Sequence, residues 1–211
     1  MAARFRLVLI SPDAPDPGNV ARLERLLPGL AASADALVLR WSGHDARSII
    51  ESARRLAAVR PRPPLLLRDR FDLARAAQLE GVQLPEDGMP PAAVRDCWPE
   101  AMIGVSRHDA TGLALRSEGA DFALLSPVFE SESKPGQCGI GLASVAVLAS
   151  GCRVDLIAMG GIDAARAHLV VVAGAAGAGV RSAVFGSPDP VSAAASIRAA
   201  LDSAAAASPD H

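Results

Sequence analysis

Residues 154–181 read VDLIAMGGIDAARAHLVVVAGAAGAGVR and contain one complete strand–helix–strand unit. The apolar run Val154–Ala158 has the length and composition of a strand that is buried on both faces. Glycine and aspartate follow it, and the amphipathic stretch Ala164–Ala173 predicts a helix that leads to a second strand at Gly179–Arg181. This order of elements is typical of a parallel sheet whose strands are connected by helices.

The same unit recurs along the whole chain. The other strands are expected at Arg6–Ile10, Ala36–Arg40, Pro64–Arg68, Gly81–Leu84, Ala101–Gly104 and Phe122–Leu125. The other helices are expected at Val20–Leu30, Ala46–Val59, Phe71–Leu79, Pro91–Asp96, Thr111–Glu118, Leu142–Ala149 and Val191–Ala204. Eight such units favour a closed (β/α)8 TIM barrel over a doubly wound sheet. We expect residues 1–205 to form this single domain and residues 206–211 to form a frayed tail.

Length and composition exclude several classes of protein. The chain has 211 residues, of which 50% are hydrophobic and 21% charged, with a net charge of −2, so it can bury the core of one domain. The balanced charge and the absence of tyrosine argue against a nucleic-acid partner. No apolar run is long enough to span a membrane. The beginning of the chain does not resemble a secretory signal, and three scattered cysteines argue against a disulfide framework, so we expect a cytoplasmic protein.

Two glycine-rich turns indicate a phosphate site. In TIM barrels the loops after the seventh and eighth strands often hold a phosphate. Here Gly160 and Gly161 follow the seventh strand, and Ser182 and Ala183 follow the eighth, where a short helix is expected to begin. Glycine lets backbone N–H groups approach an anion, and a helix start adds positive charge. The alternative is that these glycines only make tight turns.

The long loop after the sixth strand carries the only lysine of the chain. Lys134 follows Ser131 and Ser133, and the other 20 basic residues are arginines. Long loops in compact domains are often functional. We therefore expect a lid that brings Lys134 and the two serines to the phosphate, the alternative being an ordinary surface loop.

Polar residues end several other strands. His108 lies just after the fifth strand and could act as a general acid and base, although a histidine at the surface or in a helix cap is an equal alternative. Arg40, Arg68 and Ser106 are the candidate substrate-binding residues at the same face.

Six segments carry motifs of one family: Gly81–Pro85 (GVQLP), Ile103–His108 (IGVSRH), Gly119–Phe122 (GADF), Ser126–Lys134 (SPVFESESK), Gly160–Ile162 (GGI) and Ser182–Val184 (SAV). With them the chain resembles the thiamine phosphate synthase/TenI superfamily, and the resemblance covers roughly Arg6 to Phe185, nearly the whole chain. The resemblance implies a (β/α)8 barrel that binds a thiazole or thiamine phosphate. It leaves two activities open, a synthase that joins a pyrimidine diphosphate to a thiazole phosphate with magnesium, and a metal-free thiazole tautomerase of TenI type.

The chain departs from the synthase pattern at the diphosphate and metal positions. Of the motif Gln-x-Arg-x-Lys on the second strand only Arg40 remains, and Arg68 stands where the synthases have asparagine. Gly88 falls on the position of a metal-binding aspartate, so a synthase would have to hold magnesium with Asp69 and Asp87.

The TenI pattern matches better. Gln83-Leu84-Pro85 is similar to its Val-Gln-Leu-Pro motif, and His108 falls on the histidine to which that branch assigns proton transfer. Our preferred hypothesis is therefore a thiazole tautomerase that needs no cofactor. The alternatives are a magnesium-dependent thiamine phosphate synthase and a non-catalytic binder of thiazole or thiamine phosphates. Barrels of this family can associate, so a homo-oligomer stays open.

Overall fold

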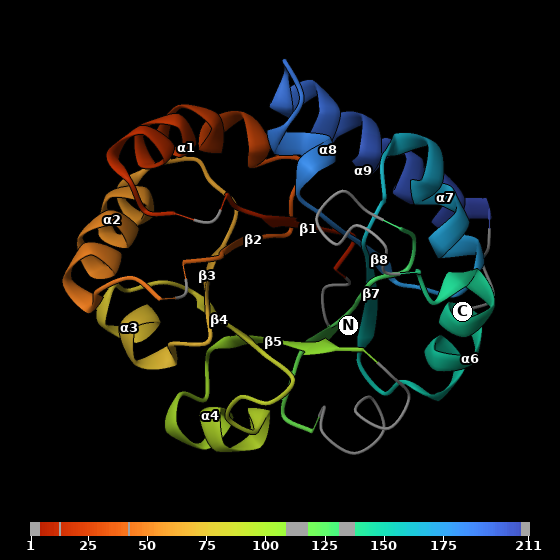
Figure 1. Ribbon diagram of the computed structural model, residues 1–211, viewed down its shortest axis with the longest axis horizontal. Coiled ribbons are helices and arrows are strands. Elements are labelled where there is room, and N and C mark those ends of the chain that lie inside the picture. Colours follow the sequence, from red (N-terminus) through yellow and green to blue (C-terminus); the bar gives the residue numbers. More distant parts are fainter. Residues whose placement is uncertain (1–4, 13, 42, 109–117, 131–137, 208–211) are drawn as a thin grey trace.

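Eight parallel strands close into a barrel in the computed structural model, which describes residues 5–12, 14–41, 43–108, 118–130 and 138–207. Each strand pairs with its neighbours in sequence, and β8 closes the ring on β1. The expected (β/α)8 fold is confirmed (Figure 1). The strands are β1 (Leu7–Ile10), β2 (Ala36–Leu39), β3 (Leu65–Arg68), β4 (Gly81–Leu84), β5 (Met102–Arg107), β6 (Phe122–Leu125), β7 (Asp155–Met159) and β8 (Gly177–Val180).

Helices surround the barrel (Figure 1). They are α1 (Pro17–Leu30), α2 (Ala46–Ala58), α3 (Phe71–Ala76), α4 (Pro91–Cys97), α6 (Gly141–Gly151), α7 (Ala164–Val172), α8 (Ser182–Phe185) and α9 (Pro190–Ala207). The helix expected at Thr111–Glu118 lies almost entirely outside the described residues. The last helix includes the first two residues of the segment expected as a tail, and the remaining four lie outside the description.

Two apolar layers hold the barrel together. The inner layer fills the barrel with side chains from β1, β2, β3, β6 and β7, among them Val8, Val38 and Phe122. The outer layer lies between the strands and the helices and contains most of the buried leucine and valine side chains. Strand residues therefore alternate between the two layers, which is why the strands read as continuous apolar runs rather than as alternating patterns.

Two strand boundaries differ by more than one residue from those expected. β5 continues three residues further, to Arg107, because Ser106 and Arg107 pair with Leu124 and Leu125 of β6. β8 begins two residues earlier, at Gly177, where an added Cβ atom would collide with the carbonyl group of Arg6 beside β1. Close strand pairing thus extends the sheet through polar and glycine residues that do not look strand-like in sequence.

Within the part of the chain that the structure describes, no helix has both the length and the apolar character needed to cross a membrane.

Candidate functional site

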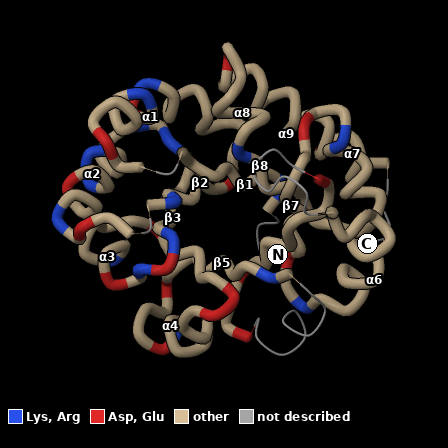
Figure 2. The backbone as a smooth tube through the Cα atoms, in the orientation of Figure 1, with Lys and Arg blue, Asp and Glu red and all other residues tan. Residues whose placement is uncertain are grey.

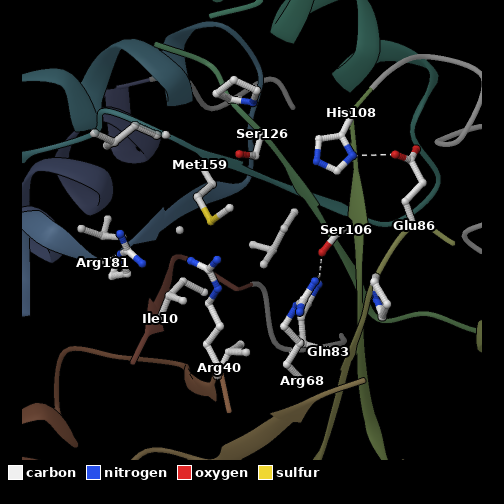
Figure 3. Close-up of a pocket in the computed structure, with 18 of the residues that line it drawn as sticks. Ile10, Arg40, Arg68, Gln83, Glu86, Ser106, His108, Ser126, Met159 and Arg181 are labelled. Carbon is white, nitrogen blue, oxygen red and sulfur yellow. Dashed lines mark hydrogen bonds and ion pairs between the residues drawn. The ribbon is translucent and has the colours of Figure 1, made fainter. Parts of the chain in front are cut away.

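A cavity of about 530 Å³ opens at the carboxyl ends of the strands. This is the face at which TIM barrels place their active sites. Residues on or just after every one of the eight strands line it (Figure 3). The polar and charged members are Arg40, Arg68, Gln83, Glu86, Asp87, Ser106, His108, Ser126, Arg181 and Ser182.

The floor of the cavity is apolar. Ile10, Val38 and Leu124 belong to the inner layer of the barrel and reach the cavity from below, and Met159 packs against the same layer. A floor of this kind suits the flat apolar face of a heterocyclic ring, and the polar groups above it can fix the ring's orientation.

Three arginines line one side of the cavity. Arg40 follows β2, Arg68 ends β3 and Arg181 follows β8. The strands β8, β1, β2 and β3 are consecutive in the barrel, so the three arginines lie along one continuous arc of its rim. The backbone N–H of Arg40 donates to Oγ of the fully buried Ser11 at 3.0 Å, which fixes the turn after β2. Figure 3 shows the side chains of Arg40 and Arg181 directed into the cavity. Arg40 and Arg68 are predicted site residues that the structure brings together.

Arg181 is a cavity residue that the sequence analysis missed. It immediately precedes Ser182 in the turn already assigned to phosphate, and this position was the available signal. It was overlooked because the prediction considered the backbone of the turn and treated Arg181 as the last residue of a buried strand. β8 ends one residue earlier, at Val180, so Arg181 belongs to the following turn and lines the cavity.

The opposite side of the cavity carries an imidazole and two carboxylates. Nδ1 of His108 lies 2.5 Å from Oε2 of Glu86, and Asp87 lines the same rim. His108 is 46% exposed, so the pair sits at the edge of the cavity rather than in its depth (Figure 3). In Figure 2 the acidic positions gather toward β5 and α4, and basic positions lie near β3 and β8. The cavity is therefore polarised, with guanidinium groups on one side and carboxylates on the other.

Gln83 and Ser106 form a polar pair between these two sides. Nε2 of Gln83 donates to Oγ of Ser106 at 3.2 Å. Gln83 is almost fully buried, and an added Cβ atom on Gly104 would collide with its Oε1 atom, so the glycine makes room for the amide. Ser106, predicted as a substrate-binding residue, does line the cavity.

The glycine turn after β7 adopts a left-handed backbone conformation and is hydrogen-bonded to the segment after β6. Gly160 has φ of 105° and Gly161 has φ of 64°, which favour glycine. The N–H groups of Val128 and Phe129 donate to Met159 and Gly160 at 2.8 and 3.1 Å. Both glycines line the cavity, and phosphate binding by them stays a prediction.

The turn after β8 also lies at the cavity. Ser182 is the first residue of α8 and lines the cavity, and Ala183 is the second residue of the same helix, half-buried beside it. The first N–H groups of a helix have no partner within the helix. Ser131, Ser133 and Lys134, the predicted lid residues, lie outside the described residues.

The residues expected to hold magnesium are not gathered. Asp87 lines the cavity, but Asp69 and Gly88 are not among its lining residues. Asp69 adopts a left-handed conformation with φ of 70°, and its N–H donates to the Gln83 carbonyl group at 2.9 Å. Among the described residues, no three histidine, cysteine, aspartate or glutamate side chains are arranged to hold a metal ion. The donor set therefore does not fit a protein-held magnesium ion.

Trp41, at the end of the second predicted strand, does not face the cavity. Its side chain is 1% exposed and packs in the outer apolar layer. Trp41 therefore packs behind the site and does not narrow the cavity.

Comparisons with known proteins place the chain in a family. Residues 7–184 match a family model described as thiamine monophosphate synthase. The chain is 35% identical over 191 residues to a putative thiamine-phosphate synthase of Geobacter sulfurreducens, covering 88% of this chain and 89% of that one. It is 36% identical over 185 residues to the thiamine-phosphate synthase of Anaeromyxobacter dehalogenans, covering 84% and 82%. A solved thiamine phosphate pyrophosphorylase from Pyrococcus furiosus superposes with a TM-score of 0.80 at 26% identity, covering 95% of this chain and 97% of that one.

These findings correct the preferred activity. The relatives carry the name of the synthase, and the similar solved structure is a pyrophosphorylase, so the expectation of a thiazole tautomerase was wrong. That expectation relied on His108 as a proton shuttle, and in the structure Nδ1 of His108 contacts Glu86. The match over residues 7–184 shows that the chain belongs to the thiamine monophosphate synthase family.

Proposed function

We propose that this protein is a transferase that joins a pyrimidine diphosphate to a thiazole phosphate and releases diphosphate. The observation that carries the proposal is the presence of two different anion-binding arrangements in one cavity. A glycine turn lies after β7, and three arginines lie on the side formed by β8, β2 and β3. A binder of one monophosphate needs only the first of these, whereas the joining reaction brings in two phosphorylated substrates.

The thiazole phosphate is assigned to the two turns after β7 and β8. Gly160 and Gly161 let backbone N–H groups approach the phosphate, and the start of α8 at Ser182 and Ala183 supplies further N–H groups. Lys134, Ser131 and Ser133 are proposed to complete this subsite, as the sequence predicts.

The diphosphate is assigned to Arg40, Arg68 and Arg181. In the reaction the lone pair of the thiazole ring nitrogen forms a bond to the methylene carbon of the pyrimidine. The bond from that carbon to the diphosphate oxygen breaks, and its electron pair leaves with the diphosphate. Negative charge grows on the leaving oxygen, and guanidinium groups already in place stabilise it. No proton needs to be removed from carbon in this step.

The heterocycles are proposed to lie over the apolar floor between the two anion subsites. Gln83 and Ser106 offer an amide and a hydroxyl group beside the floor, which suits the nitrogen atoms and amino group of a pyrimidine. Holding two rings in one orientation converts a reaction between two molecules into a step within one complex.

Turnover with both substrates tests the proposal. The purified protein, incubated with the pyrimidine diphosphate and the thiazole phosphate, is expected to form thiamine phosphate, detected by chromatography and mass. Arg40→Met is expected to reduce kcat by about a hundredfold, because it removes a charge at the leaving group. Binding of both compounds without any product would reject the synthase and favour a non-catalytic binder.

A further inference from the structure

We infer that the arginine cluster, defined as Arg40, Arg68 and Arg181, binds the diphosphate in place of a protein-held magnesium ion. This inference rests on the proposed function and adds how the site neutralises the diphosphate. It starts from a disagreement within the cavity. The family resemblance implies magnesium, but the described carboxylates are not arranged as a metal site.

The carboxylates of the cavity are few and poorly placed for a metal. Glu86 is engaged by His108 at 2.5 Å, and Asp87 is an exposed rim residue. Asp69 is outside the lining, and Gly88 has no side chain to offer. Magnesium demands near-ideal octahedral oxygen geometry and is usually held by one or two carboxylates together with substrate phosphates. A single exposed aspartate on the side opposite to the arginines does not supply that arrangement.

The arginine cluster supplies what the metal would supply. The three side chains come from β2, β3 and β8, and all three line the same cavity (Figure 3). A guanidinium group binds phosphate oxygens through two parallel hydrogen bonds and keeps its charge at every working pH. Three such groups can neutralise the several negative charges of a diphosphate without a divalent cation.

One of the three arginines, Arg68, stands where the sequence departs from a metal-dependent site. Arg68 occupies a position that carries asparagine in the synthase pattern, so a neutral amide is replaced by a positive charge. Arg181 lies between the glycine turns and Arg40, at the junction of the two proposed anion subsites. Relative to the synthase pattern, the loss of a carboxylate at Gly88 and the gain of a guanidinium group at Arg68 both make the site more positive.

The geometry therefore assigns Arg181 as a substrate-binding residue of the diphosphate subsite. Its backbone begins the turn into α8, and the carbonyl group of Arg181 accepts from Val184 and Phe185 at 3.2 and 2.9 Å. This anchoring fixes the root of the side chain beside the cavity, so that less freedom is lost when an anion binds.

Calorimetric titration with inorganic pyrophosphate, in EDTA and in excess magnesium chloride, tests the inference. The wild-type protein is expected to bind pyrophosphate in EDTA as tightly as in magnesium or more tightly, because magnesium competes for the phosphate oxygens. A dissociation constant at least about tenfold weaker in EDTA, or no binding in either buffer, would overturn the inference. Neither result depends on whether a variant folds.

Arg181→Met gives the second readout, with Arg25→Met as its matched control. Arg25 is an exposed residue of α1 outside the cavity, so both variants lose one positive charge. Arg181→Met is expected to weaken pyrophosphate binding in EDTA by about tenfold or more, and Arg25→Met is expected to bind like the wild type. If both variants bound pyrophosphate equally weakly, the loss of net charge alone would explain the effect. That result would reject the assignment of Arg181. Product formation is measured separately, so pyrophosphate binding without thiamine phosphate synthesis would reject the proposed function and not the anion site.

Discussion

Nδ1 of His108 lies 2.5 Å from Oε2 of Glu86 at the rim of the barrel, with the imidazole half in solvent (Figure 3). The contact joins the ends of β4 and β5, where the two loops leave the barrel. It engages one ring nitrogen and fixes the orientation of the ring. For the proposed joining reaction, we expect His108 to position the β4 and β5 loops rather than to act on the reacting atoms.

His108→Gln is therefore expected to reduce kcat for thiamine phosphate formation by less than about tenfold. General acid–base catalysis contributes about a hundredfold to ten-thousandfold, and the joining step needs no such proton transfer. Steady-state kinetics with both substrates measures the effect. A loss of a hundredfold or more at unchanged KM would show that His108 acts on the reacting atoms.

Ser106→Ala is expected to raise the KM for the pyrimidine diphosphate by about tenfold. The substitution removes the hydroxyl group that faces the cavity and leaves Nε2 of Gln83 without its acceptor. The KM for the thiazole phosphate is expected to change much less, because its phosphate is bound at the other turns. Equal changes in both KM values would place Ser106 outside the pyrimidine subsite.

Gly161→Ala is expected to weaken binding of the thiazole phosphate and to destabilise the protein. Its φ of 64° costs an alanine about 1–2 kcal/mol, and the new Cβ atom would lie 2.5 Å from the carbonyl oxygen of Glu130, so the turn must move. Isothermal titration with the thiazole phosphate and urea unfolding measure the two effects.

Gly174→Ala is the control for this substitution. Gly174 has φ of 97° and follows α7, outside the candidate site, and its nearest neighbour for a Cβ atom is the side chain of Ala149 at 3.2 Å. We expect a similar loss of stability and unchanged binding. If both variants bind the thiazole phosphate like the wild type, the glycine turn is not the phosphate site.

Glu80→Gln is expected to destabilise the fold by about 1–2 kcal/mol near neutral pH. Glu80 accepts two hydrogen bonds from Arg62 at 2.7 and 2.9 Å and one from the N–H of Leu65, at the start of β3. Partial burial alone would raise the pKa of Glu80, but these donors outweigh it and hold the pKa below its ordinary value of 4.5. Glu80 is 40% exposed, and screening by water keeps the effect modest.

The pH dependence of this effect follows from the sign of the shift. A lowered pKa stabilises the folded state above the unfolded value, and the contribution disappears as the pH falls through the folded pKa. The difference in the free energy of unfolding between the wild type and Glu80→Gln should therefore disappear well below pH 4.5. Glu24→Gln, which breaks the more exposed pair with Arg55, should cost at most about 0.5 kcal/mol in the same urea titrations. A gap that persists at low pH would exclude the ion pair as its origin.

The barrel could be predicted from the sequence because each unit repeats the same physical pattern. Apolar runs such as Phe122–Leu125 match their strands residue for residue, since both faces of a barrel strand are buried. The ends of β5 and β8 could not be predicted in the same way. Ser106 and Arg107 become strand residues only because β6 pairs with them, and that pairing is a long-range contact.

The sequence predicted the part of the candidate site that the backbone forms, the glycine turn. It did not predict the part that depends on the direction of a side chain, Arg181. Gly160 and Gly161 predict a turn whose backbone can approach an anion, and both residues line the cavity. Arg181 is one of 20 arginines, and only the closed barrel shows that it faces the cavity. The activity was misjudged because the lost synthase side chains, the Gln83-Leu84-Pro85 motif and His108 were weighted above three arginines that lie far apart in the sequence.

The most direct test of the synthase account is the release of pyrophosphate from the pyrimidine diphosphate, measured with and without the thiazole phosphate. The account predicts that pyrophosphate appears only when both substrates are present, in equal amount to thiamine phosphate. Release at the same rate without the thiazole phosphate, or thiamine phosphate formation too small to match it, would contradict the account.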